Sequence, residues 1–343
     1  MTITRDPQNL FGLIEHTDII NDLDRQFQIF PDNMFDQRNT NQTAILFDVD
    51  ERTTTLLPSS DRGSRQASYG KDTNFRTHAL PLAYFKHEER IVPEDLLSVR
   101  RRGTPDGVET LDLVRLEKLT DMRRRWDQTA EFMKAKAIFT GQCVSPNAVV
   151  YADMFTEFGV TQDSVDFELG TATTDVAAKV RQVKRLMRDN LKNGGIMVQP
   201  TIYVPVDFFD ALTSHATVKE AYKYYTATNQ MAGKQPLRDD LGESFVYAGV
   251  EFRSLDGSFT LPDGTSSNLL EDGIGYAVPN VSGIYKSWHG PSNKLSAING
   301  AVADVYAYEW RDAKDEGHDL EMEAAPLFVN TKPKATIKVL AGL

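Results

Sequence analysis

The sequence predicts an α+β fold in which one long helix is combined with a mixed α/β region and many extended segments. Residues 110–140 contain neither Gly nor Pro, and their apolar residues recur at the three-to-four spacing of an amphipathic helix. Residues 173–225 alternate helical and buried-strand patterns, which is typical of helices packed on a sheet. With 343 residues, of which 41% are hydrophobic, the chain can bury a core of this complexity.

The N-terminal part is predicted to form an arm followed by a long, hairpin-like loop. Residues 1–45 are weakly patterned and carry one or two short helical stretches. Residues 44–50 and 75–85 are strand-like and enclose a polar, glycine-containing tip at 59–72. Each arm of about ten residues could reach roughly 33 Å at about 3.3 Å per residue. This is a long distance for a loop to extend from the body when it has little hydrophobic content of its own.

Four interpretations fit the basic tip: a phosphate-binding loop, a modification site, a linker, or an arm that lies on another molecule. A phosphate-binding loop is disfavoured because Gly63 and Gly70 are not followed by a Lys-Ser/Thr pair or by an apolar helix. The match of residues 62–68 to a kinase site is of a kind that arises often by chance. The flanking strands argue against a linker. A loop too polar to stabilise itself is expected to become ordered by docking on a partner.

The long helix at 110–140 would run about 45 Å at 1.5 Å per residue, and one of its sides is basic. Its apolar positions include Leu116, Leu119 and Trp126, and Gly141 ends it. A basic helix face is compatible with nucleic-acid binding, but a solvated face or a subunit contact is the favoured interpretation. The basic positions are Arg115, Lys118, Arg123, Arg124, Arg125 and Lys134.

The remaining elements are predicted from shorter patterns. Residues 144–169 are predicted to form a strand hairpin in which 149–151 faces 165–167. Asp175 follows two threonines and is predicted to cap a second helix at 175–192. Residues 257–273 are expected to be rich in loops. Further helices are expected at 206–214 and 216–225, and further strands at 201–204, 244–253, 274–279, 302–310, 320–329 and 336–340.

The charge balance and the lack of catalytic motifs favour a structural protein over an enzyme. The chain has 38 Lys and Arg against 49 Asp and Glu, a net charge of -11, which argues against tight general binding to nucleic acid. The single cysteine, Cys143, excludes an intrachain disulfide and a multi-cysteine metal site. His87 precedes two glutamates, but Ile91 stands where a zinc-protease helix needs its second histidine. No cofactor is expected.

A metal-dependent hydrolase or transferase is kept as an alternative because acidic residues gather between 256 and 273. Their spacing does not fit an EF-hand, and Asp-Gly turns explain two of them. The N-terminus lacks the apolar segment of a secretory signal, and no window approaches about 18 uncharged apolar residues. The chain is therefore expected to be made in the cytoplasm and not to span a membrane.

Three stretches of the chain carry a resemblance to a known family. Near the start, NMF at 33–35 and TAILFD at 43–48 look like a Phe-rich arm that leads into a strand. In the middle, the basic loop is followed by the helix with RRR at 123–125. At the end, AAPLFVN at 324–330 and ATIKVLA at 335–341 look like a terminal strand and its partner. In this order of elements the chain resembles the major capsid proteins of lambda-like tailed phages, which have the Hong Kong 97-type fold.

The resemblance implies that the chain divides into the parts of that capsid fold and has their role. The protein would be a structural subunit, not an enzyme, that assembles into hexamers and pentamers of an icosahedral shell around double-stranded DNA. A tail or decoration protein is the other alternative among virion components. The implied parts are an N-terminal arm at 1–45, an extended loop at 46–90, a peripheral domain at 91–172 and 301–343 with its spine helix at about 110–140, and an axial domain at 173–300.

The resemblance also implies the partners and the place of the protein. It would bind other copies of itself, a scaffolding protein during assembly and the portal, with a decoration protein as a further candidate. Packaged DNA would be touched only weakly at the inner surface, and no membrane is involved. The protein would be assembled in the bacterial host cytoplasm and localised in the virion capsid.

Eight residues are expected to make contacts between subunits. A shell that bound DNA tightly would stall packaging, and a net acidic subunit avoids this by repelling DNA. The basic side chains of the loop would therefore meet acidic groups on a neighbouring copy instead of phosphates. The arginines of the long helix are placed in the same class. The expected contact residues are Arg62, Arg65, Tyr69, Lys71, Arg76, Arg123, Arg124 and Arg125.

Overall fold

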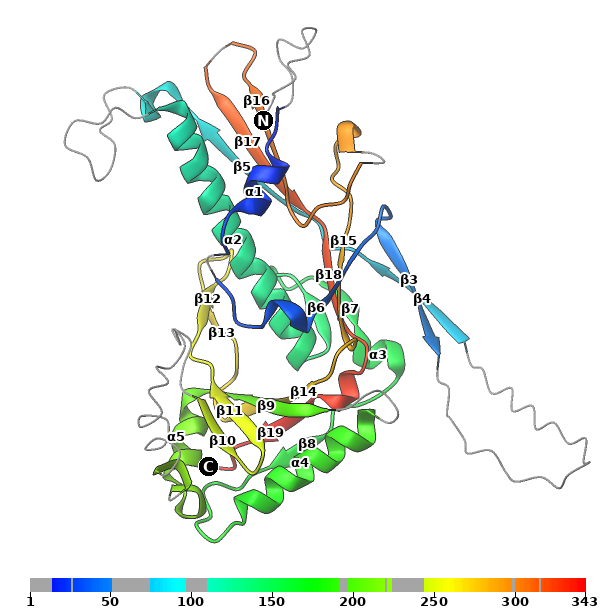
Figure 1. Cartoon of the computed structure of the whole chain (residues 1–343), viewed down its shortest axis with the longest axis vertical. Helices are drawn as coiled ribbons and strands as arrows, with labels where there is room; N and C mark the ends of the chain where they lie inside the picture. Colours follow the sequence, from blue (N-terminus) through cyan, green and yellow to red (C-terminus); the bar gives the residue numbers. More distant parts are fainter. Residues whose placement is uncertain are drawn as a thin grey trace, which may run out of the picture.

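The computed structural model is an elongated α+β molecule with one long helix beside several small sheets (Figure 1). It describes residues 14–25, 27–50, 75–96, 110–191, 197–219, 221–223, 244–297, 300–314 and 316–343. The predicted α+β class is confirmed.

Helix α2, Leu111–Phe139, matches the predicted long helix closely. Its first half is partly solvated, and Leu116 is 44% exposed although it was expected on the apolar face. Its second half is buried on most sides, and the helix as a whole contacts strands of four different sheets. Gly141 ends the helix with a φ of +64°, and a Cβ there would lie 2.8 Å from the Phe155 ring, so both backbone and space require glycine.

A four-stranded antiparallel sheet lies beside the first half of α2. Its order is β1 (Ile14–Glu15), β16 (Tyr306–Arg311), β17 (His318–Ala324) and β5 (Phe85–Ile91). The short helix α1, Thr17–Asp22, follows β1 and packs on β16. Strand β5 therefore lies in a sheet of the body, although residues up to 90 were expected in the extended loop.

A three-stranded sheet continues from the first one. It contains β18 (Pro326–Asn330), β15 (Tyr285–His289) and β2 (Asp36–Asn39). The single strand expected at 320–329 is wrong, because the chain leaves β17 at Ala325 and enters β18 in the other sheet. Pro326 has no N–H and so cannot donate a ladder hydrogen bond at the start of β18. The carbonyl of Ala325, just before it, accepts from the backbone N–H of Gly290 at 2.8 Å. The break lets one segment join two sheets.

A six-stranded sheet forms the far end of the molecule. Its order is β10 (Ser244–Tyr247), β11 (Val250–Ser254), β9 (Val198–Val204), β14 (Ile274–Asn280), β19 (Ile337–Leu340) and β8 (Ser164–Asp166). Helices α4 (Val176–Leu191) and α5 (Val206–Ser214) cover one face. The end of α2 covers the other, where Phe139 stacks on Tyr276 of β14 with ring centroids 5.1 Å apart. The predicted cap of α4 is confirmed, since Asp175 accepts from the Ala178 N–H at 3.0 Å.

The strand hairpin expected at 144–169 is wrong. Strand β7 (Val150–Asp153) pairs with β6 (Gln142–Val144), and β8 pairs in parallel with β19. The Asp153 carboxylate accepts from the N–H groups of Phe155 and Thr156 and so starts helix α3, Met154–Phe158, where the hairpin would have continued. Two short strands, β12 (Ser258–Thr260) and β13 (Ser266–Asn268), pair within the segment expected to be rich in loops.

Cys143 in β6 is expected to be unreactive in the native protein. Its side chain is buried, and burial raises the pKa of the thiol to about 12. A chromogenic disulfide reagent at about pH 8 should therefore modify it slowly, and rapidly and completely after unfolding in urea. Fast stoichiometric labelling of the folded protein would contradict this placement.

Candidate assembly surfaces and the contacts that support them

A two-stranded hairpin extends from the body of the molecule (Figure 1). Strand β3 (Ala44–Asp50) pairs with β4 (Phe75–Pro81) in antiparallel register from Ala44 opposite Pro81 to Asp50 opposite Phe75. Leu46 on β3 is 67% exposed. An isolated two-stranded hairpin is marginally stable in water, so this element gains stability from whatever covers it.

The root of the hairpin is fixed to the body by backbone hydrogen bonds. The Leu82 N–H donates to the Thr43 carbonyl at 3.0 Å, and the Ala83 N–H donates to the Pro326 carbonyl of β18 at 3.0 Å. A cavity of about 290 Å³ lies at this root. It is lined by Thr43, Leu82, Ala83, Tyr84, Pro291, Ser292, Asn293 and Ala325.

Two buried carboxylates of β17 lie next to the root. Glu321 binds Lys294 at 2.6 Å and Lys86 at 3.1 Å. Glu323 accepts from the Ser292 hydroxyl at 2.6 Å and has Lys294 at 3.7 Å. Burial and the hydrogen bond to Glu323 raise the pKa of Glu321, because both favour its protonated form. The two lysines thus tie β5 and the loop after β15 to the same strand.

The expected contact residues of the loop fall mostly outside the described structure. Arg62, Arg65, Tyr69 and Lys71 lie beyond the described residues, and their role stays a prediction. Arg76 lies in β4, opposite Val49 of β3 in the hairpin register.

The three arginines of α2 occupy two different environments. Arg123 is 3% exposed, and its guanidinium binds Asp127 at 3.0 Å and Asp304 at 3.4 Å within the same chain. This burial differs from the expected contact between subunits, because the side chain already has partners inside the fold. Arg124 and Arg125 are exposed, and Arg124 pairs with Asp121 at 3.1 Å.

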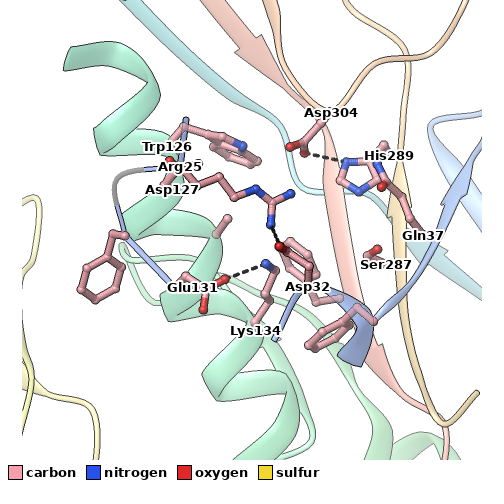
Figure 2. A pocket seen from close by; sticks show the side chains of 14 residues that line it. Arg25, Asp32, Gln37, Trp126, Asp127, Glu131, Lys134, Ser287, His289 and Asp304 are labelled. Carbon is pink, nitrogen blue, oxygen red and sulfur yellow. Dashed lines mark hydrogen bonds and ion pairs between the residues drawn. The ribbon is translucent and has the colours of Figure 1, made fainter. Parts of the chain in front are cut away.

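Glu131 anchors the N-terminal arm to the long helix. Its Oε2 accepts from the backbone N–H groups of Ile29 at 2.9 Å and Phe30 at 3.1 Å, and its Oε1 binds Lys134 at 2.6 Å. Figure 2 shows Glu131 and Lys134 on α2 facing the small polar cavity under the arm. The Phe30 ring packs edge-on against Phe139, so the arm is held by both polar and apolar contacts.

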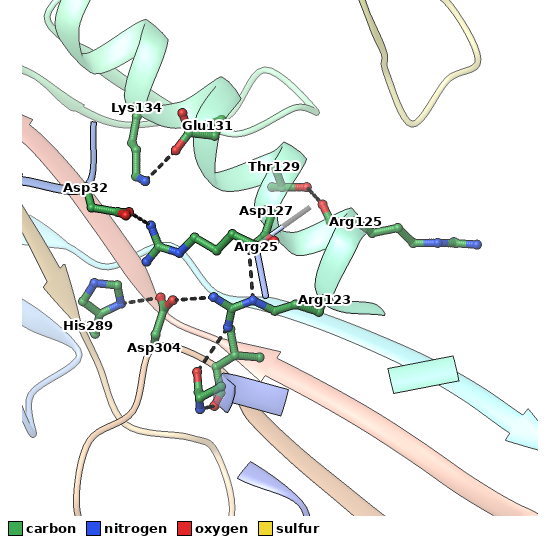
Figure 3. A network of polar contacts seen from close by, with 12 residues as sticks. Arg25, Asp32, Arg123, Arg125, Asp127, Thr129, Glu131, Lys134, His289 and Asp304 are labelled. Atoms are coloured by element: carbon green, nitrogen blue, oxygen red, sulfur yellow. Dashed lines mark hydrogen bonds and ion pairs between the residues drawn. The ribbon is translucent and has the colours of Figure 1, made fainter. Parts of the chain in front are cut away.

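Asp304 joins the arm region, the helix and the three-stranded sheet. It binds His289 of β15 at 3.0 Å and Arg123 of α2 at 3.4 Å (Figure 3). Arg123 also donates to the Asn21 side chain at 3.2 Å. Burial alone would raise the pKa of Asp304, but the His289 hydrogen bond and the charge of Arg123 lower it to about 2. The carboxylate is therefore charged and holds three elements together.

Glu309 is a second buried carboxylate with several cationic or titratable partners. It is 0% exposed, and its Oε2 contacts His16 at 2.7 Å and the Arg115 Nε at 2.6 Å. Its Oε1 contacts His318 at 2.6 Å and the Arg115 Nη2 at 2.9 Å. Burial opposes ionisation, but the hydrogen bonds from His16 and Arg115 lower the pKa of Glu309 to about 2. The cluster connects the arm, α2 and two strands.

Comparison with known sequences shows the family to which the chain belongs. A model described as phage major capsid protein E matches residues 15–341. The chain belongs to this family. The major capsid protein of Salmonella phage Felix O1 is 29% identical over 324 residues, covering 88% of this chain and 88% of that protein. The major capsid protein of Pseudomonas phage KPP10 is also 29% identical, covering 89% of each.

Solved capsid structures share the fold of this capsid subunit. The capsid of Ralstonia phage GP4 superposes with a TM-score of 0.52 at 11% identity, covering 89% of this chain and 86% of that one. The mature capsid of bacteriophage PhiM1 gives a TM-score of 0.50 at 10% identity, covering 93% and 89%. The fold is the Hong Kong 97-type, as expected from the sequence. The protein is a structural subunit of a phage capsid, assembles with its own copies and belongs to the virion.

The carboxylates that organise this capsid subunit were not predicted from the sequence. Glu131, Asp304 and Glu309 were not singled out as candidates. A signal was present for Glu309, Glu321 and Glu323, because each has an apolar or aromatic residue on both sides in a strand-like run. A charge in such a position is buried only with partners.

The acidic segment of the capsid subunit behaves as a turn. The Asp263 carboxylate accepts from the Thr265 N–H at 2.9 Å and from its hydroxyl at 2.6 Å, between β12 and β13. Among the residues with described placement, no group of three His, Cys, Asp or Glu side chains is arranged to hold a metal ion. Within that same part of the chain, no helix combines the length and hydropathy needed to cross a bilayer.

Proposed function

We propose that this capsid subunit forms hexamers and pentamers of an icosahedral shell around double-stranded DNA, with the β3–β4 hairpin lying over a neighbouring copy. The observation that carries the proposal is the hairpin itself. It forms a two-stranded sheet of its own, and Leu46 is two-thirds exposed on it. A neighbouring copy would supply the covering surface that such a hairpin needs.

The proposal includes the roles assigned to individual parts. Residues 1–45 act as the arm, 46–90 include the extended loop, and α2 serves as the spine of a peripheral domain. The basic residues of the expected contact set, apart from the buried Arg123, pair with acidic groups of the neighbouring copy. Single exposed pairs contribute only about 0–1 kcal/mol, so the shell is held by the sum of many repeated interfaces.

The proposal also names partners beyond the subunit. A separate scaffolding protein directs assembly in the bacterial host cytoplasm, the portal occupies one vertex, and a decoration protein binds the finished shell. Co-expression with the scaffolding protein, followed by sedimentation and negative-stain microscopy, tests this part. Shells of uniform size that require the scaffold are expected, and efficient uniform assembly of the subunit alone would contradict the scaffold assignment.

Substitution of Leu46 by Ser should reduce shell yield several-fold without unfolding the subunit. The side chain is 67% exposed in the single chain, so little of the fold depends on it, whereas its burial under a neighbour would stabilise each contact by about 1.5–3 kcal/mol. Sedimentation measures shell yield, and circular dichroism checks the fold. Leu116→Ser, at a 44% exposed position of α2, is the matched control. Equal yields for both variants would remove Leu46 from the interface.

A further inference from the structure

Helix α4 carries a basic row on the side turned away from its sheet. Val180, Val183 and Met187 are fully buried against the six-stranded sheet. Side chains that are three, four or seven residues apart share a face of a helix. The opposite side of α4 presents the α4 row, which consists of Arg181, Lys184, Arg185 and Arg188.

Half of the positive charge in the α4 row has no partner in the described chain. Arg181 pairs with Asp175 at 3.3 Å, and both side chains are more than half exposed. Lys184 donates to the Ala248 carbonyl at 3.3 Å. Arg185 and Arg188 are exposed, and neither forms an ion pair with any residue whose placement is described. The row therefore offers two guanidinium groups without an ion-pair partner among the residues of described placement, in a chain of net charge -11.

The surroundings of the row favour a polyanion over a tightly packed protein surface. Protein interfaces have apolar, well-packed centres from which charged residues are depleted. The structure describes all of α4 from Val176 to Leu191, and none of these residues is a large apolar residue with an exposed side chain. Guanidinium groups match phosphate with paired, charge-assisted hydrogen bonds. A nucleic-acid backbone provides such phosphates at a regular spacing.

We propose that the α4 row contacts the phosphate backbone of duplex DNA. The assignment of that DNA to the packaged genome rests on the proposed function, in which the shell encloses double-stranded DNA, and adds to it that this face of α4 lies on the inside of the shell. The contact is weak and independent of base sequence, since it involves phosphates alone and since the acidic subunit as a whole repels DNA. Weak contact allows DNA to move over the surface during packaging.

The number of charges in the row sets the expected salt dependence. Each phosphate neutralised by Lys or Arg contributes about -0.9 to the slope of log K against log salt for duplex DNA. Three or four contacts per row therefore correspond to a slope of about -3. Removal of Arg185 and Arg188 should reduce the magnitude of this slope by about 2.

The test is fluorescence anisotropy of a labelled duplex of about 30 base pairs with the unassembled full chain, between about 20 and 150 mM salt. The test variant is R185E/R188E, and the matched control is R124E/R125E on α2. Both variants replace two exposed arginines on a helix by glutamates, so both change the net charge equally. A poly-glutamate chain of comparable charge is titrated in parallel.

Binding by the wild type with a slope near -3, an at least tenfold loss in R185E/R188E and a loss of less than about threefold in the control is the expected result. Equal losses in both variants, or no binding by the wild type, would overturn the proposal. Preferential binding of poly-glutamate would overturn it as well and assign the row to an acidic protein surface. Shell assembly of the variants is scored separately, so a failure of this inference is distinguishable from a failure of the proposed function.

Discussion

Deletion of residues 60–72 should abolish closed shells while leaving a folded, soluble subunit. These residues lie between β3 and β4 in the sequence, and we assign their contacts to a neighbouring copy. The described residues by themselves form two hydrophobic cores, so the free energy of unfolding of the single subunit should change little. Sedimentation and negative-stain microscopy measure assembly, and urea unfolding measures the subunit.

A matched variant separates the length of the loop from its chemistry. Replacement of residues 60–72 by a Gly/Ser segment of equal length preserves chain connectivity but removes Arg62, Arg65, Tyr69 and Lys71. It should assemble as poorly as the deletion if side-chain contacts matter. Abundant shells of normal size from both variants would show that the loop has no role in assembly.

Glu309→Ala should lower the free energy of unfolding by about 3–5 kcal/mol. The substitution removes the carboxylate that contacts Arg115, His16 and His318 within 2.6–2.9 Å, and leaves the buried part of the Arg115 charge without its partner. The same substitution removes the side-chain contact of His16 in the arm with β16. Urea unfolding followed by circular dichroism gives the change in stability.

Two comparisons show whether the loss comes from the buried cluster. Glu309→Gln keeps the size and can still accept hydrogen bonds, so its loss should be smaller than that of Glu309→Ala. Glu88→Ala removes an exposed partner of Lys86 on β5 and should change the free energy of unfolding far less than Glu309→Ala, because water screens an exposed pair. A loss for Glu309→Ala no larger than that for Glu88→Ala would contradict the assigned role of the cluster.

The acid stability of the subunit should depend on Glu309 and Asp304. Each has its pKa lowered to about 2 in the folded protein. A lowered pKa contributes stability above the ordinary carboxyl value near 4, and that stability is lost as the pH falls toward 2. Glu309→Gln should therefore make the free energy of unfolding fall less steeply between about pH 4.5 and 2. An unchanged slope would exclude Glu309 as a source of acid sensitivity.

The local patterns of the sequence predicted some elements accurately. The bounds of α2 followed from a Gly- and Pro-free stretch that ends at Gly141, and the cap at Asp175 followed from its side chain. The β3–β4 hairpin followed from two strand-like runs around a polar tip. In each case the deciding interactions are close in sequence or made by the backbone itself.

Pairing and burial between distant segments could not be predicted in the same way. Strand β8 pairs with β19, which lies more than 170 residues later, whereas local pattern favoured a hairpin with β7. Arg123 stands next to Arg124 and Arg125 in sequence, yet it is buried by Asp304 and the arm while its neighbours are exposed. Glu131 acquires its role only when Ile29 and Phe30 pass over it.

The central claim is that the hairpin of each subunit lies on a neighbouring copy in a closed shell. Electron cryomicroscopy of shells assembled from the full chain and its scaffolding protein tests this most directly. We expect hexamers and pentamers in which residues 44–81 of each subunit cross onto the adjacent one and bury Leu46. A shell whose hairpins fold back on their own subunits, or a chain that forms no shell with its scaffold, would contradict the account.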